Sequence, residues 1–140
     1  MSVSRTAVCE DRGDSGLAVL VKAGPAVFVA DEPESIGGHD LGPNPHDLVA
    51  ASLALCTDHT LRLYAQRKGW TLGAVKVEVE HYRDPAAEKP ETFVRTLTLP
   101  PGLDEAQRTS MLSIAERCPI HRLLAPGANI RTILTPSLAA

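Results

Sequence analysis

Two cysteines of this sequence each precede a histidine by three residues. Cys56 is followed by His59 and Cys118 by His121, whereas Cys9 has no histidine at this spacing. A thiolate is a nucleophile and a metal ligand, and a neighbouring cation or hydrogen-bond donor lowers the pKa of a thiol. We therefore interpret Cys56 and Cys118 as the residues that carry chemistry, and Cys9 as incidental.

This pattern leaves several interpretations open. The two thiols could form a redox pair, in which one attacks and the other resolves. The two C-x-x-H pairs could bind zinc, although structural zinc sites usually place C-x-x-C on a knuckle. Cys56 could be a hydrolytic nucleophile with His59 or His121 as its base. Either cysteine could also be a small apolar core residue, as free cysteines often are.

Cys56 lies in a segment that predicts a long helix from Pro45 to Lys68. Asn44 is a favourable N-cap, a proline fits the first helical position, and Gly69 suits the C-terminal stop. The run from Leu48 to Cys56 has no polar stripe, and a helix that is apolar all round is normally buried all round. We therefore expect a long, buried central helix.

The rest of the chain predicts an α+β fold in a single domain over residues 1–140. Cys118 directly precedes Pro119, which ends one helix and suits the start of another, so this thiol could be an N-cap. The expected elements besides the central helix are a three-stranded meander (residues 2–9, 17–22 and 26–30), a β-hairpin (75–81 and 93–99), a second helix (104–117), a helical turn (121–124) and a final strand (130–135).

Composition excludes several classes of protein. Of the 140 residues, 44% are hydrophobic and only 4% aromatic, and the net charge is −3 without a basic block, so we expect no nucleic-acid partner. The longest apolar run, residues 48–56, is far shorter than the roughly 20 residues that span a bilayer. The polar first residues lack the apolar core of a signal peptide, so we expect a cytoplasmic protein with reduced thiols and no membrane partner.

Several segments together resemble the OsmC/Ohr family of osmotically inducible and organic hydroperoxide resistance proteins, most closely its OsmC-like subgroup. The resemblance spans roughly residues 17–135. It is carried by Phe28–Pro33, Gly37-Gly38, Gly42–Pro45, Leu48–Cys56, Thr60–Ala65, Lys68–Trp70 and Ala115–Arg122.

The resemblance implies an intertwined homodimer that reduces organic hydroperoxides and needs no metal or organic cofactor. It makes Cys56 the attacking cysteine and Cys118 the resolving cysteine. Cys56 would become a sulfenic acid and then form a disulfide with Cys118, which an external dithiol would reduce. A non-catalytic binding or redox-sensing module with a weakly reactive cysteine pair is the alternative.

One position departs from the family pattern. The pattern places a glutamate after the asparagine and proline that begin the long helix, where it pairs with an arginine that stabilises the thiolate. Here His46 occupies that position and Asp47 follows. His46 lies ten residues before Cys56, about 15 Å along a continuous helix, so it cannot reach Cys56 through that helix.

The groups that activate or orient Cys56 therefore have to be sought elsewhere in the chain. Arg5 and Arg12 are the candidates for the family's arginine, because it comes from the N-terminal strands. We expect His59 to lower the pKa of Cys56, with His121 and the His46–Asp47 pair as further candidates.

Overall fold

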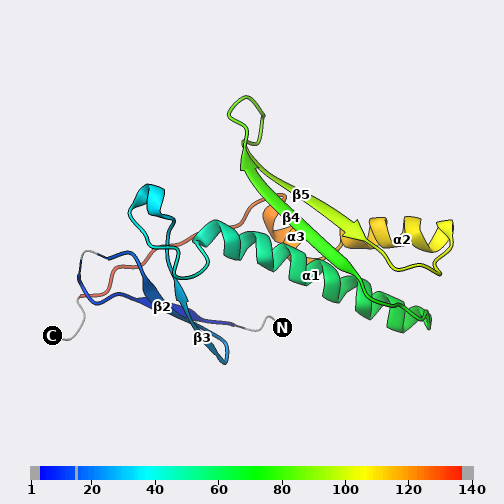
Figure 1. Ribbon diagram of the computed structural model, residues 1–140, viewed down its shortest axis with the longest axis horizontal. Coiled ribbons are helices and arrows are strands. Elements are labelled where there is room, and N and C mark those ends of the chain that lie inside the picture. The colour runs from blue at the N-terminus through cyan, green and yellow to red at the C-terminus, as the bar shows by residue number, and fades with distance from the viewer. Residues whose placement is uncertain (1–3, 15, 137–140) are drawn as a thin grey trace. The chain divides into compact units, whose positions relative to one another are not determined.

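Figure 1 shows the computed structural model, which describes residues 4–14 and 16–136. The chain forms two compact units. Unit 1 combines the residues up to Ala54 with Glu78–Thr96, and unit 2 combines Leu55–Val77 with the residues from Leu97 onward. Neither unit is a continuous stretch of chain, because one helix and two strands each begin in one unit and end in the other. The single domain expected from the sequence stays a prediction.

The N-terminal part of unit 1 is the expected meander. Strands β1 (Ala7–Glu10), β2 (Val19–Ala23) and β3 (Ala26–Ala30) form an antiparallel sheet in that order. Gly24 turns the chain between β2 and β3 with a φ of 58°, a conformation that glycine adopts without strain. The first strand is shorter than expected, since residues 4–6 lie outside it and residues 2 and 3 lie outside the described part.

The loop that leads from β3 to the long helix is organised by one carboxylate. Asp31 is buried, and it accepts hydrogen bonds from the backbone amides of Glu32, His39 and Leu41. A Cβ atom on Gly38 would collide with the carbonyl of Glu32, so the loop closes on itself too tightly for a side chain. The short 3₁₀ helix η1 (Glu34–Ile36) lies within this loop.

The long helix α1 (Pro45–Lys68) has the predicted bounds. Its start is fixed by a reciprocal cap, in which the amide of Asp47 donates to Asn44 Oδ1 (2.8 Å) and the amide of Asn44 donates to Asp47 Oδ2 (3.0 Å). Because both contacts are local, the sequence could specify where the helix begins.

The expectation that the first half of α1, residues 48–56, is buried all round is wrong for the described chain. Within residues 48–56 only Leu53 is buried, and Leu48, Val49 and Leu55 are exposed, Leu55 to 58%. An apolar sequence pattern shows which side chains avoid water. It does not show whether their own chain or another molecule covers them.

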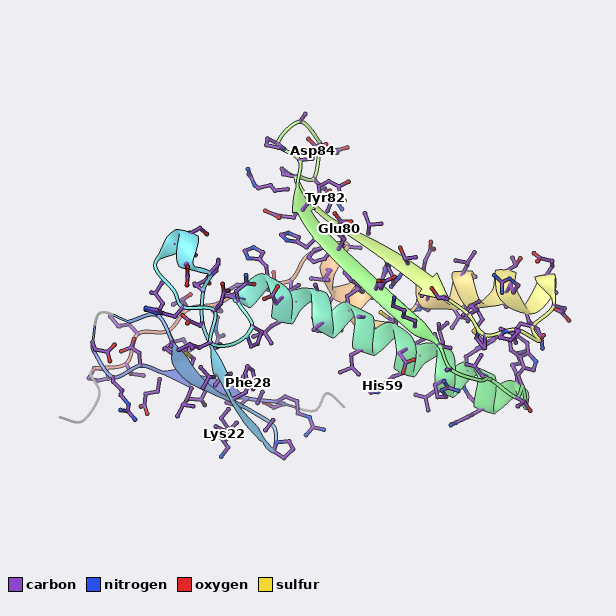
Figure 2. All side chains as sticks on the ribbon, viewed as in Figure 1. Lys22, Phe28, His59, Glu80, Tyr82 and Asp84 are labelled. Atoms are coloured by element: carbon purple, nitrogen blue, oxygen red, sulfur yellow. The ribbon has the colours of Figure 1, made fainter. Side chains whose placement is uncertain are left out.

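A two-stranded sheet follows α1, formed by β4 (Lys76–Arg83) and β5 (Glu91–Thr98). The turn between them begins at Asp84, which Figure 2 labels at the end of the hairpin. The amide of Asp84 donates to the carbonyl of Pro90 at 2.8 Å. Side-chain exposure alternates along β4, so the expected hairpin with one wet face is confirmed.

Unit 2 contains the hydrophobic core that supports the second half of α1. Helix α2 (Glu105–Ala115) begins with a capping box between Asp104 and Gln107, and α3 (Pro119–Leu124) follows it. The core consists of two residues from α1 and three from α2, with partly buried side chains of α1, β5 and the segments that flank β4 and β5 packed against them. The five buried core residues are Leu61, Ala65, Met111, Ile114 and Ala115.

The expected final strand is not formed. Residues 130–135 have no regular secondary structure, and Ile130 and Leu134 are more than 90% exposed. High β-propensity does not create a strand without a partner strand, and the described sheets contain only β1–β3 and β4–β5. No helix among the described residues has the length and apolar character needed to cross a membrane.

Candidate redox site

The two cysteines singled out by the sequence meet in unit 2. Cys56 lies on α1 and is partly exposed, whereas Cys118 is fully buried between α2 and α3. Their side chains share a hydrogen bond, and both are free thiols. The structure therefore brings together two residues that are far apart in the sequence, and it leaves one of them accessible from outside.

Cys118 is held in place by the start of α3. Its backbone is extended, Pro119 occupies the first position of the helix, and the amide of His121 donates to Cys118 Sγ at 3.2 Å. The predicted N-cap is confirmed. Thr57, the residue after Cys56, also donates to this sulfur from its hydroxyl, over a long distance of 3.8 Å.

Burial raises the pKa of Cys56 above its usual range, and the hydrogen bond and charge of Cys118 raise it further. The backbone amide of Ile120 acts in the opposite direction, as does Thr60, whose hydroxyl donates to the backbone carbonyl of Cys56 at 2.8 Å, but these effects do not outweigh burial. The strongest influences on this thiol therefore favour the neutral form. In the single chain the pKa of Cys56 is therefore raised, whereas the sequence predicted a lowered pKa.

The two histidines of the C-x-x-H pairs have different surroundings. His59 is exposed and projects outward from α1 (Figure 2), and it is not among the strongest influences on Cys56. His121 is partly exposed and supplies its backbone amide to Cys118. Within residues 4–14 and 16–136, no group of three or more His, Cys, Asp or Glu residues could hold a metal ion, so the two C-x-x-H pairs do not come together as such a group there.

His46 belongs to a separate cluster within unit 1. Its ring stacks on that of His81, with the ring centroids 4.8 Å apart and the ring planes 17° from parallel. The ring of His81 in turn lies against that of Phe93, with their centroids 4.8 Å apart. His81 Nε2 lies 2.6 Å from Glu91 Oε2, and Arg83 Nε lies 3.3 Å from Glu91 Oε1. The hydrogen bond from His81, with the charges of His81, Arg83 and His46, lowers the pKa of Glu91.

The remaining candidates from the sequence are a helix-capping residue and two exposed arginines. Asp47 caps α1, and Arg5 and Arg12 are exposed residues on either side of β1 in unit 1. Their roles in activating Cys56 stay predictions.

Sequence reasoning missed Thr57, because a threonine in a helix carries no chemical signal by itself. It also missed Glu91, although the turn from Asp84 to Pro90 places the residues that flank it, Arg83 and Glu91, opposite each other.

The chain matches the family model described as OsmC-like protein over residues 37–133, and it belongs to that family. No protein with a curated function matches the sequence significantly.

Solved structures show the same fold. A Psychrobacter arcticus protein named for the osmotic stress and detoxification response is 21% identical, with a TM-score of 0.72 over 90% of this chain and 92% of that one. The Legionella pneumophila organic hydroperoxide resistance protein OsmC is 22% identical, with a TM-score of 0.67 over 88% and 90%. OhrB of Bacillus subtilis is 20% identical, with a TM-score of 0.60 over 88% and 91%.

Proposed function

We propose that this protein is a thiol-dependent peroxidase that reduces organic hydroperoxides, with Cys56 as the attacking residue and Cys118 as the resolving residue. The observation that carries the proposal is the hydrogen-bonded pair itself, with one partly exposed and one fully buried thiol. Membership of the OsmC-like family supports it, because two structural neighbours are named for organic hydroperoxide resistance.

The first step takes place at Cys56. Its thiolate attacks one oxygen of the hydroperoxide, the S–O bond forms as the O–O bond breaks, and the departing alkoxide takes up a proton to become the alcohol. Cys56 is then a sulfenic acid. The backbone amide of Ile120 stabilises negative charge on the sulfur before the attack.

The second step uses Cys118. Its sulfur attacks the sulfur of the sulfenic acid, the S–S bond forms, and the oxygen leaves as water with the proton of the Cys118 thiol. Because the two side chains are already in hydrogen-bond contact, this step needs no large rearrangement. An external dithiol returns the disulfide to two thiols by exchange.

Steady-state assays test the proposal as a whole. With cumene hydroperoxide and a dithiol reductant, the protein should consume peroxide, and Cys56→Ser should abolish consumption. Cys9→Ser is the matched control, because Cys9 is exposed and lies in unit 1. An unchanged rate in Cys56→Ser would reject Cys56 as the attacking residue.

The raised pKa of Cys56 favours a second candidate, a redox-sensing module whose cysteine pair reacts slowly. At neutral pH the neutral thiol predominates, and thiols react far more slowly than thiolates. A sensor would form the same disulfide but turn over too slowly to remove peroxide. The rate of the first step distinguishes the two functions.

We also propose that the protein acts as a homodimer. Leu48, Val49, Leu55 and Leu63 of α1 are exposed, as are the apolar residues near the end of the described chain. Exposed apolar groups of this kind are typical of surfaces that another molecule covers. A second copy of the chain would remove them from water and supply the burial that the α1 sequence indicates.

A further inference from the structure

We propose that Thr57 is a positioning residue, which holds the sulfur of Cys118 ready to attack the oxidised sulfur of Cys56. This inference rests on the proposed function, because it concerns the second step of that reaction. Thr57 does not touch the peroxide. Its effect passes through Cys118.

The first observation is the placement of the Thr57 hydroxyl. Thr57 is fully buried, and its Oγ1 donates to Cys118 Sγ. Thr57 also follows Cys56 on α1, so one rigid segment of helix carries both the sulfur to be attacked and a donor to the attacking sulfur. The distance between the two sulfurs is thereby tied to the helix backbone.

The second observation is that a second donor acts on the same sulfur. The amide of His121 reaches Cys118 Sγ from α3, and the hydroxyl of Thr57 reaches it from α1. Two donors from different helices restrict where the sulfur can lie, and both favour negative charge on it. Because the His121 amide would remain after a change at Thr57, we expect that change to weaken the site and not to abolish it.

The size of the effect follows from thiol chemistry. Losing a donor lowers the fraction of thiolate, but it also makes the remaining thiolate more nucleophilic, which recovers about half of the loss on a logarithmic scale. A tenfold fall in the thiolate fraction thus slows attack by about threefold. With some loss of alignment added, we expect Cys118 to attack roughly three to ten times more slowly without the hydroxyl.

The matched variants are Thr57→Val, which keeps the shape and removes the hydroxyl, and Thr57→Ser, which keeps the hydroxyl and removes the methyl group. Both are made in a Cys9→Ser background so that only the pair reacts. Thr57→Ala also removes the hydroxyl, and it replaces Thr57→Val if the valine variant does not fold. Melting temperatures show whether each variant is folded.

Dithiodipyridine measures the attack by Cys118 without peroxide. The reagent forms a mixed disulfide with the accessible Cys56 and releases one thiopyridone. Cys118 then attacks the Cys56 sulfur of that bond, the protein disulfide forms, and a second thiopyridone leaves. Cys118→Ser should stop after the first release, which assigns the two phases.

The proposal predicts that Thr57→Val slows the second release roughly three- to tenfold and changes the first by less than about twofold, and that Thr57→Ser restores the second release. It is overturned if valine and threonine give the same second rate, if serine is as slow as valine, or if the protein with Thr57 gives no second release. A slowed second release in a protein that does not react with peroxide would refute the proposed function alone.

Discussion

Cys56 and Cys118 share a hydrogen bond although they come from different helices, and Cys118 is fully buried whereas Cys56 is partly exposed. This asymmetry fits an order of events in which a reagent from outside meets Cys56 first. The partner that must react second is already in contact and protected from the same reagent.

The reactivity of Cys56 should still be rising with pH at pH 9. Its pKa is raised from an ordinary value of 9.0, mainly by burial, so the thiolate is still accumulating at that pH. Iodoacetamide alkylation of the Cys9→Ser protein, with Cys56 followed by peptide mass, measures the profile. A plateau below pH 9 would show that an activating group outweighs burial.

Replacing Cys118 by Ala should speed the alkylation of Cys56 at pH 8, because Cys118 contributes to the raised pKa of Cys56.

Asp31→Asn should lower the melting temperature at neutral pH by several degrees. An amide has one acceptor oxygen, and it cannot accept from the backbone amides of Glu32, His39 and Leu41 as the two carboxylate oxygens do. These three hydrogen bonds also lower the pKa of Asp31, with the one from Glu32 contributing most.

The effect of Asp31→Asn should depend on pH. A lowered pKa in the folded state means that the carboxylate stabilises the fold above the unfolded value of 3.8, and that this contribution is lost as the pH falls through the folded value. The difference in melting temperature between the two proteins should therefore shrink below pH 3.8. A difference that stays constant would mean that the substitution acts through packing alone.

Leu61→Ala should destabilise the protein by about 2–5 kcal/mol, because Leu61 is fully buried in the core of unit 2 and alanine would leave a cavity. Leu112→Ala on α2 is the control, since Leu112 is 61% exposed. We expect it to cost less than about 0.5 kcal/mol in the monomer. Urea unfolding measures both, and equal losses would contradict the assigned core.

The local features of the fold could be predicted from the sequence, and the features that need a distant partner could not. The cap of α1 lies within four residues, and its predicted bounds match the structure. The strand expected at residues 130–135 needs a partner strand, which the sequence does not specify.

The candidate site can likewise be divided into features that the sequence could predict and features that depend on packing between distant segments. The pairing of Cys56 with Cys118 could be expected from the recurring motif and the family resemblance. The stacking of His46 on His81 and the contact of Thr57 with Cys118 depend on how helices and strands pack, so no sequence pattern predicts them.

Leu55→Glu should weaken self-association if α1 lies in a homodimer interface, because a charged group would replace a leucine that is 58% exposed. Sedimentation velocity over a range of concentrations should show a dimer for the parent protein and a shift toward monomer for the variant. Leu112→Glu on α2, at a similarly exposed leucine, serves as the control. A parent protein that remains monomeric at high concentration would reject the dimer.

The central claim is tested most directly by intact mass and non-reducing peptide mapping after one equivalent of cumene hydroperoxide. The account predicts that the protein loses two hydrogen atoms, that the new bond maps to Cys56 and Cys118, and that Cys56→Ser does not form it. Two thiols that stay unchanged under these conditions, in a folded protein, would contradict the account.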